Sequence, residues 1–295
     1  MRRTMLFIPG NNPSMVINSD VFGADSIIYD LEDAVSPNEK DAARILIRNI
    51  LRTKQNNSIE KIVRINSLKT EYWRKDLQEV LPVGIDVILV PKAESKEDIL
   101  LVDSYLEELE ERYNIEKGKT LIMPLIESTL GVENSFEIAS SSKRVTAIFL
   151  GAEDLTADMG VKRTKEGQEI QYSRTRLVIA AKAAEIGAMD TPFTDTNDYE
   201  GLREDTVFAK SLGFTGKAVI SPRHIDIVNE VFTPTEEELY YAQRVIYAIE
   251  EAEKMGKGAV SLDGKMIDAP IVNRARQVIE MWNKVNGGTE DEETC

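Results

Sequence analysis

The sequence predicts a (β/α)8 TIM barrel followed by a C-terminal helical appendage that acts as a lid. Short apolar, β-branched segments alternate with longer segments in which apolar residues recur every three or four positions. Eight such pairs span roughly 220 residues, the usual length of a barrel. The rival fold, a doubly wound open sheet, usually carries a glycine-rich turn after its first strand. In this sequence the turn after the first strand is residues 9–13, PGNNP, which is not a G-x-G-x-x-G fingerprint. This favours the barrel.

The expected elements follow one another in regular order along the chain. Residues 95 and 98, a serine and an aspartate, are typical of a helix N-cap. Gly187 and Gly213 each follow a helical segment and are expected to be C-caps. The expected strands are residues 5–9, 26–31, 61–66, 86–91, 121–127, 147–151, 188–193 and 217–221, and the clearest helices between them are residues 38–52, 96–113 and 168–186.

After the eighth strand the alternating pattern ends. We expect a catalytic barrel over residues 1–233 and a helical lid or oligomerisation segment over residues 234–286. Within that segment a long helix (235–257), a glycine-rich turn (256–258) and a last helix (269–285) leave too few strand-like residues for a sheet. Residues 287–295 are acidic and are expected to be a disordered tail.

Composition excludes several classes of protein. The net charge of −15 argues against nucleic-acid binding, which needs a basic surface. The sequence has no apolar run of about 18 residues, so no membrane span is expected. Cys295 is the single cysteine, and an intrachain disulfide is therefore impossible. Together with a charged fraction of 29%, these features predict a cytoplasmic enzyme.

Polar residues gather where the predicted strands end, which in a barrel is the mouth that carries the active site. The second strand runs into Asp30, Glu32 and Asp33, the fifth ends at Glu127, and the sixth is followed by Asp154. Carboxylates that converge in this way repel one another unless a cation lies among them. Oxygen ligands without cysteine favour Mg²⁺, with Mn²⁺ as an alternative, and Glu127 and Asp154 on adjacent strands are the candidate ligands. Helix capping or solvation is the alternative role for these two carboxylates.

Strand three contains Arg64 and Asn66 in an otherwise apolar segment, and strand four ends at Lys92. Arg64, Asn66 and Glu127 are candidate substrate-binding residues. An arginine within a barrel strand needs a carboxylate partner. Either Arg64 grips a carboxylate of the substrate, or it pairs with Asp30 or Asp33 in a structural role.

Three other features are expected to be structural. His224, the single histidine, is favoured as a capping or packing residue over a general base. The serine run at residues 140–142 is typical of a turn that ends a helix. Cys295 lies in the predicted tail and is not expected to be a nucleophile.

Several motifs in this order resemble the β-subunits of citrate lyase, within the HpcH/HpaI aldolase and citrate lyase superfamily. The resemblance covers about residues 2–285, and the combination of motifs is specific although each alone is weak. The motifs are residues 3–10 (RTMLFIPG), 30–35 (DLEDAV), 63–66 (VRIN), 91–92 (PK), 124–128 (PLIES), 151–155 (GAEDL) and 213–217 (GFTGK).

The resemblance implies a carbon–carbon lyase that cleaves a citryl thioester to oxaloacetate and an acetyl thioester. It implies Mg²⁺ held by Glu127 and Asp154, and Arg64 on the carboxylate that becomes part of oxaloacetate. A G-x-x-x-D segment at residues 264–268 matches one that reaches a neighbouring subunit's site in related malyl-CoA lyases, which makes Asp268 a candidate general acid. The base for the substrate hydroxyl stays open between Asp33, Glu32 and a metal-bound hydroxide.

The same resemblance implies a homo-oligomer, a trimer or a hexamer, that works with the α and γ subunits of citrate lyase. Relatives that use free coenzyme A often carry a basic residue where this sequence has Asn12. That departure favours a substrate carried on the γ subunit, an acyl carrier protein, over citryl-CoA. The alternatives are a malyl-CoA or citramalyl-CoA lyase and, less favoured, a non-catalytic scaffold subunit.

Overall fold

The structure is a computed structural model that describes residues 1–53, 59–254 and 260–287. It divides into two compact units, Arg2–Asn229 and Glu230–Cys295, the second also including Met1. Each unit is described by itself below.

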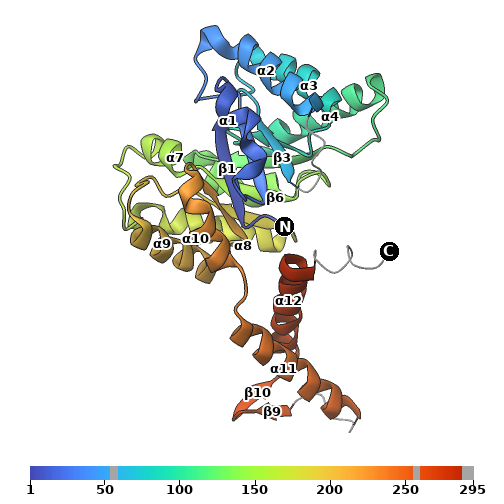
Figure 1. Ribbon diagram of the computed structural model, residues 1–295, viewed down its shortest axis with the longest axis vertical. Coiled ribbons are helices and arrows are strands. Elements are labelled where there is room, and N and C mark those ends of the chain that lie inside the picture. The colour runs from blue at the N-terminus through green and yellow to red at the C-terminus, as the bar shows by residue number, and fades with distance from the viewer. Residues whose placement is uncertain (54–58, 255–259, 288–295) are drawn as a thin grey trace. The chain divides into compact units, whose positions relative to one another are not determined.

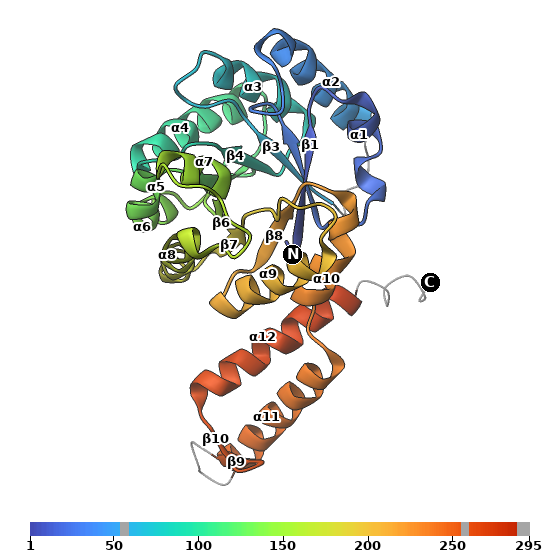
Figure 2. The ribbon, with the colours of Figure 1, turned by 90° about the vertical axis from the view of Figure 1, so that its left-hand side faces the viewer.

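Within the described part of the first unit, eight parallel strands close into a barrel in sequence order, and β1 pairs with both β2 and β8. This confirms the predicted (β/α)8 fold and excludes the open sheet. Figure 2 shows the helices arranged around the strands. The strands are β1 (Thr4–Pro9), β2 (Ser26–Asp30), β3 (Glu60–Arg64), β4 (Val87–Val90), β5 (Leu121–Ile126), β6 (Ala147–Leu150), β7 (Gly187–Asp190) and β8 (Gly216–Val219).

Most strands end one to three residues earlier than the sequence predicts. Strand β7 is the clearest case, since it stops at Asp190 whereas apolar character continues to Phe193. Inside the barrel, one buried cluster contains side chains from all eight strands, including Met5, Ile28 and Phe149. The strands thus form a packed core, and the residues just beyond their ends are left to build the barrel mouth.

The helices of the first unit cover the outside of the barrel. The capping box of Ser95 and Asp98 at the start of α4 is present as predicted, and Gly213 (φ 105°) caps α9. The elements are α1 (Pro13–Ile17), η1 (Ser19–Val21), η2 (Pro37–Glu39), α2 (Lys40–Thr53), α3 (Tyr72–Val80), η3 (Leu81–Val83), α4 (Lys96–Arg112), α5 (Thr129–Glu133), α6 (Ser135–Ala139), α7 (Ala152–Asp158), η4 (Gln168–Ile170), α8 (Gln171–Ala183), α9 (Tyr199–Leu212), η5 (Pro222–His224) and α10 (Ile225–Phe232).

The prediction that Gly187 caps a helix is wrong. Helix α8 ends at Ala183 with Ala184 as its cap, and Glu185 takes the left-handed conformation (φ 59°). Gly187 instead begins β7, where an added Cβ would lie 3.1 Å from Thr215 Oγ1 and 3.3 Å from Ala147 Cβ. Crowding between neighbouring strands therefore accounts for this glycine.

The C-terminal unit consists of α11 (Glu236–Lys254), β9 (Val260–Leu262), β10 (Lys265–Ile267) and α12 (Ala269–Asn286). Figures 1 and 2 show the two helices side by side with the hairpin at one end. Their facing sides pack Val245 and Ile249 of α11 with Val272 and Ala275 of α12. The expectation that this segment forms no sheet is wrong, because β9 and β10 pair as an antiparallel hairpin.

A local signal for the hairpin was present in the sequence. Asp263 (φ 51°) and Gly264 (φ 76°) are both left-handed, which a two-residue turn between antiparallel strands requires and an Asp-Gly pair readily adopts. The predicted turn at 256–258, the last residues of the predicted helix 235–257 and all of the predicted tail except Gly287 lie outside the described residues. Within the described ranges, no helix is long and apolar enough to span a membrane.

Candidate functional site

A cavity of about 650 Å³ opens among the residues that follow the barrel strands. Its apolar wall includes Phe7, Leu125 and Phe149. Its charged lining brings together residues from four strand ends: Asp30 and Asp33, Arg64, Glu127, and Glu153 and Asp154. Catalytic groups of barrel enzymes lie at this end of the strands, so this is the candidate active site.

Arg64 projects from the end of β3 and is held by Asp30 at the end of β2. Its Nε and Nη2 donate to the two carboxylate oxygens of Asp30 at 2.7 and 2.6 Å. Its Nη1 lies 3.2 Å from Glu32 Oε2 and 3.5 Å from Asp33 Oδ2, and the guanidinium lies over the Phe7 ring at 5.2 Å. The predicted structural pairing with Asp30 is therefore present, and Arg64 lines the cavity as well.

The loop after β2 is built around Asp30. The backbone N–H groups of Glu32 and Ala34 donate to its carboxylate at 2.8 and 3.1 Å. Lys40 Nζ donates to the carbonyl oxygens of Leu31 and Glu32 at 2.8 and 2.7 Å, which anchors the loop on α2. These bonds bury Glu32 and leave the Asp33 side chain about half exposed, at 53%.

Glu127 follows β5 and is 5% exposed. The backbone N–H of Lys92 donates to its Oε1 at 2.8 Å. The absence of a side chain at Gly151 leaves room for Glu127, because a Cβ added at Gly151 would lie 2.8 Å from both Cβ and Oε2 of Glu127. Burial, with the negative charges of Glu32 and Asp154, raises the pKa of Glu127 to about 8. Its environment therefore disfavours an uncompensated negative charge.

Asp154 lies in the first turn of α7, which begins at Ala152 directly after the end of β6. The Ala152 N–H donates to Thr191 Oγ1 at 3.2 Å, so the residue that follows β7 helps to hold the start of α7. The Asp154 side chain is 43% exposed, and its Oδ2 lies 3.6 Å from Lys92 Nζ.

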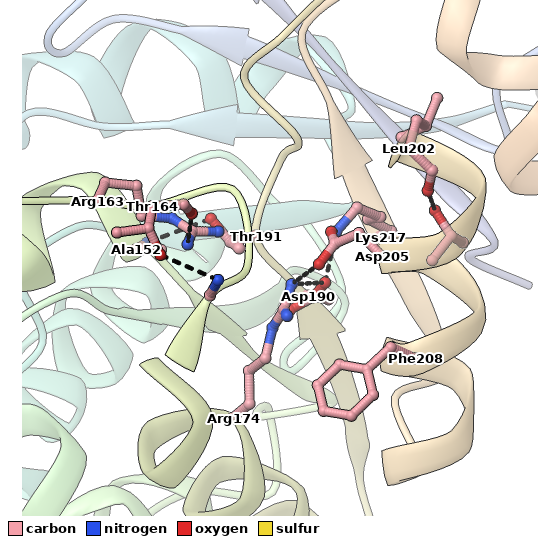
Figure 3. A network of polar contacts seen from close by, with 12 residues as sticks. Ala152, Arg163, Thr164, Arg174, Asp190, Thr191, Leu202, Asp205, Phe208 and Lys217 are labelled. Atoms are coloured by element: carbon pink, nitrogen blue, oxygen red, sulfur yellow. Dashed lines mark hydrogen bonds and ion pairs between the residues drawn. The ribbon is translucent and has the colours of Figure 1, made fainter. Parts of the chain in front are cut away.

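Behind Thr191, a buried network of charges supports the wall formed by β7 and β8. Figure 3 shows Asp190 facing Arg174 from α8 and Lys217 from β8. Arg174 Nε and Nη2 donate to Asp190 at 3.0 and 2.9 Å, and Lys217 Nζ donates to Asp190 at 2.5 Å and to Asp205 at 2.6 Å. Paired charges of this kind hold a buried position in one geometry. The motif at residues 213–217 contains Lys217, but sequence reasoning did not identify this network.

The donor set at the cavity fits a hard divalent cation. Five carboxylates meet two cations, Arg64 and Lys92, in one connected set of ion pairs and hydrogen bonds: Asp30, Glu32, Asp33, Glu127 and Asp154. Burial raises the pKa of Glu32 to about 7, even though Arg64 and Lys92 oppose that shift. Excess negative charge on buried oxygen atoms is what a Mg²⁺ ion would neutralise.

The described residues contain no group of three or more His, Cys, Asp and Glu side chains arranged to hold a metal. Mg²⁺ typically takes one or two protein carboxylates and completes its octahedron with water and substrate oxygens. Glu127, which follows β5, and Asp154, in the first turn of α7 after β6, are the candidate pair for this number.

Asn66 does not line the cavity. Its backbone N–H and its Nδ2 both donate to Asp76 Oδ2, at 2.9 and 2.8 Å, and its side chain is buried. Asp76 in turn accepts a bond from Arg44 Nε at 2.8 Å. The structure therefore gives Asn66 a contact with α3 where the sequence predicted a contact with substrate.

His224 is fully buried, and its ring packs edge-on against Tyr199 at 6.5 Å. Burial lowers its pKa, because a charged ring would be poorly solvated there. These features agree with the predicted packing role. The serine run ends α6 as predicted, with Ser140 as its C-cap.

Asp268 belongs to the C-terminal unit and is the N-cap of α12, where its carboxylate accepts a bond from the Ile271 N–H at 3.4 Å. Its side chain is partly exposed. The capping contact uses one of the two carboxylate oxygens, Oδ1.

Sequence reasoning missed three residues that line the cavity or contact its lining. Lys92 was noted as the end of a strand and as part of the motif at residues 91–92 but was given no role, yet its backbone contacts Glu127 and its side chain contacts Glu32 and Asp154. Thr191 and Pro192 line the cavity after β7, where the prediction extended the strand to residue 193. The Thr-Pro step was the available signal, because proline interrupts a strand's hydrogen bonds.

Comparison with known proteins agrees with the motifs. The profile of the HpcH/HpaI aldolase/citrate lyase family matches residues 3–222. The chain is 47% identical over 283 residues to the citrate lyase subunit beta of Leuconostoc mesenteroides subsp. cremoris, covering 96% of this chain and 94% of that protein. It is 32% identical over 295 residues to the mitochondrial citramalyl-CoA lyase of Rattus norvegicus, covering 96% and 87%.

Among solved structures, the CitE protein of Mycobacterium tuberculosis in complex with magnesium, acetoacetate and coenzyme A superposes with a TM-score of 0.78. It is 28% identical, and the match covers 96% of this chain and 98% of that one. Because the family profile matches most of the sequence and both relatives exceed 30% identity over nearly its full length, the chain belongs to the HpcH/HpaI aldolase/citrate lyase family of carbon–carbon lyases.

Proposed function

We propose that the protein is a citrate lyase β-subunit that cleaves a citryl thioester to oxaloacetate and an acetyl thioester, with Mg²⁺ (or Mn²⁺) held by Glu127 and Asp154. The observation that carries the proposal is the shared cavity of Arg64, Glu127 and Asp154 in a chain 47% identical to such a subunit. When bound, the divalent ion supplies a Lewis acid that stabilises negative charge on oxygen during the cleavage.

Arg64 suits a dicarboxylate substrate. Asp30 occupies the Nε and Nη2 positions and fixes the plane of the guanidinium, while Nη1 has only the longer contacts to Glu32 and Asp33. A substrate carboxylate bound by Nη1 is thereby held in register beside the metal ligands. The apolar side chains of Phe7 and Phe149 exclude water from the same space.

The reaction requires a proton acceptor for the hydroxyl of the citryl group. Loss of that proton lets the C–O⁻ collapse to the ketone of oxaloacetate, and the bond to the CH₂ beside the thioester breaks to leave an enolate. Asp33 and Glu32 are the candidates. Asp33 is favoured because it lines the cavity and is half exposed, whereas Glu32 is buried against Arg64 and Lys92.

A proton donor must then convert the enolate to the acetyl thioester. We assign this step to Asp268 acting on a neighbouring subunit's barrel, with the C-terminal unit as the lid that carries it. Asp268 follows directly on the β9–β10 hairpin and caps α12 with one oxygen, which leaves the other oxygen for the substrate. Donation to a neighbour also requires a homo-oligomer, a trimer or a hexamer.

The carrier of the substrate is proposed to be the phosphopantetheine arm of an acyl carrier protein, the γ subunit, with citryl-CoA as the alternative. Asn12 caps α1 through its own side chain, accepting from the Met15 N–H at 3.2 Å, and adds no positive charge for a nucleotide phosphate. An α subunit would complete the enzyme, and the cytoplasm is its proposed compartment.

One other function has an observation in its favour. The similarity to a citramalyl-CoA lyase extends over 96% of this chain, so a malyl- or citramalyl-CoA substrate is the second candidate. A turnover assay that compares citryl, citramalyl and malyl thioesters, each on CoA and on the carrier protein, with and without Mg²⁺, tests the proposal. We expect citryl turnover on the carrier protein to be fastest and to require Mg²⁺. Faster turnover of citramalyl-CoA would replace the proposed substrate, and no turnover of any thioester would favour a scaffold subunit.

A further inference from the structure

Lys92 has an unusual backbone conformation at the cavity. It follows β4 and adopts φ 54°, the left-handed region that side chains other than glycine rarely occupy. Such a conformation persists only where contacts compensate for the strain. The contact here is the hydrogen bond from the Lys92 N–H to Glu127 Oε1 at 2.8 Å. The strained backbone therefore directs an N–H group at one of the two proposed metal ligands.

The side chain of the same residue contacts the other proposed ligand. Lys92 Nζ lies 3.6 Å from Asp154 Oδ2, 3.2 Å from Glu32 Oε1 and 3.8 Å from Asp33 Oδ1. Arg64 is already committed to Asp30 by two short hydrogen bonds. Arg64 Nη1 shares Glu32 and Asp33 with Lys92, at 3.2 and 3.5 Å, and it is the ammonium group of Lys92 that links these two carboxylates to Asp154.

A divalent cation bound by Glu127 and Asp154 would lie beside the Asp154 carboxylate, whose Oδ2 Lys92 Nζ now contacts. The ion would carry two positive charges within a few ångströms of the ammonium group, and the two cations would compete for Asp154. Lysine suits an exchangeable contact, since its ammonium group sits on a flexible stem and its charge has no fixed direction. The Lys92 side chain is 36% exposed, which leaves it room to move.

We propose that Lys92 is an exchangeable counter-ion of the metal site: its ammonium group holds Asp154 and Glu32 together until Mg²⁺ displaces it from Asp154. This inference rests on the proposed function, in which Glu127 and Asp154 bind the metal. The backbone of Lys92 stays in place through its bond to Glu127, so the exchange moves only the side chain. Lys92 is thus a positioning residue for Asp154 and Glu32, and its ammonium group weakens metal binding because it competes for Asp154.

Metal binding to the full-length protein tests the exchange without any assay of activity. Mn²⁺ binding is measured by electron paramagnetic resonance, and Mg²⁺ binding by calorimetry, for wild type and Lys92→Met. Removing a unit positive charge a few ångströms from a divalent ion is expected to tighten binding about tenfold. Without metal, the variant should also have a lower melting temperature than wild type, because the ammonium group no longer offsets the repulsion between the carboxylates. Added Mg²⁺ should raise the melting temperature of the variant more than that of wild type.

Three further variants separate the effect of the ammonium group from the effects of backbone strain and of net charge. Lys92→Gly removes the ammonium group and relieves the left-handed strain, so it is expected to fold and to bind Mn²⁺ as tightly as Lys92→Met. Lys92→Arg keeps the charge and should bind near the wild-type affinity. Lys69→Met is the matched control, because Lys69 pairs with Glu94 at 2.9 Å on the surface and its loss changes net charge by the same amount. That control should leave the affinity unchanged.

The outcomes separate the two claims. If wild type binds no Mn²⁺, or if Glu127→Gln binds it as well as wild type does, the proposed metal site itself is wrong. If Glu127→Gln abolishes binding but Lys92→Met and Lys92→Gly bind as wild type or more weakly, only the exchange by Lys92 is overturned. Equal tightening in Lys69→Met would also overturn it, since the effect would then come from net charge alone.

Discussion

Asp30 and Arg64, on adjacent barrel strands, form a bidentate pair with N–O distances of 2.7 and 2.6 Å at the edge of the cavity. The pair does two things at once. It neutralises a buried arginine, and it fixes the plane of the guanidinium so that Nη1 faces the acidic loop and the cavity. A structural partner and a binding role are therefore compatible in one residue, although sequence analysis set them as alternatives.

Arg64→Lys is the first prediction. Lysine keeps the charge but cannot hold Asp30 with two parallel bonds and still present a third N–H. We expect inhibition by oxaloacetate to weaken by about 10- to 100-fold, corresponding to a charged hydrogen bond of about 1.5–3 kcal/mol. Arg2→Lys is the control, because Arg2 makes a similar bidentate pair with Glu60, neither of which lines the cavity. An unchanged inhibition constant would reduce Arg64 to a structural role.

Glu127→Gln and Asp154→Asn test the metal ligands. Each change keeps the shape of the side chain and removes the charge that a hard cation requires. Cleavage should be abolished in both variants at saturating Mg²⁺, with an unchanged circular dichroism spectrum. Glu153→Gln is the neighbouring control, since Glu153 also lines the cavity but pairs weakly with Arg163 at 3.8 Å. Near-normal turnover in either ligand variant would refute the assignment.

Asp268 is tested by mixing subunits. Asp268→Asn should lose activity while it still binds metal and oxaloacetate, and it should retain the α12 cap because asparagine also accepts the Ile271 N–H. Oligomers that combine Asp268→Asn with Glu127→Gln should regain some activity, because one protomer lends its intact Asp268 to the other's intact metal site. If verified mixed oligomers stay inactive, Asp268 does not act on a neighbouring subunit.

Glu110→Gln tests a structural ion pair by its pH dependence. Arg144 Nη1 and Nη2 donate to the two oxygens of Glu110 at 2.8 and 2.6 Å. Burial opposes ionisation of Glu110, but these bonds and the N–H groups of Gly118 and Thr120 outweigh it and lower its pKa. A lowered pKa in the folded state stabilises the protein above the unfolded pKa of about 4.3, and this stabilisation is lost as the pH falls further.

The variant should therefore unfold more easily than wild type by about 1.5–3 kcal/mol at pH 7, measured with urea. That difference should shrink as the pH falls below about 4. Glu107→Gln is the control on the same helix, where Glu107 pairs with Lys117 at 3.1 Å in an exposed position. A difference between wild type and Glu110→Gln that is independent of pH would mean that the charge of Glu110 is not what stabilises the fold.

Periodicity and turn chemistry were sufficient to predict the barrel and the helices α2, α4 and α8, because both are local properties of the chain. The capping box at Ser95 and the C-cap at Gly213 are local in the same sense, and both were found. Two errors, the missed hairpin and the overlong seventh strand, overlooked local signals, whereas a third arose where a distant contact decides. Gly187 looks like a helix cap in sequence, but the contacts that explain it are to Ala147 on β6 and to Thr215, which directly precedes β8.

The candidate site shows the same division. The sequence alone determined that carboxylates and one arginine follow successive strands, because strand order in a parallel barrel places those ends at one mouth. Only the tertiary structure decided which of these groups meet. In the folded chain Asn66 donates to Asp76 and Arg64 donates to Asp30, while Lys92 contacts both Glu127 and Asp154. The physical reason is that a hydrogen bond depends on side-chain direction and on tenths of an ångström, which the order of residues along a strand does not specify.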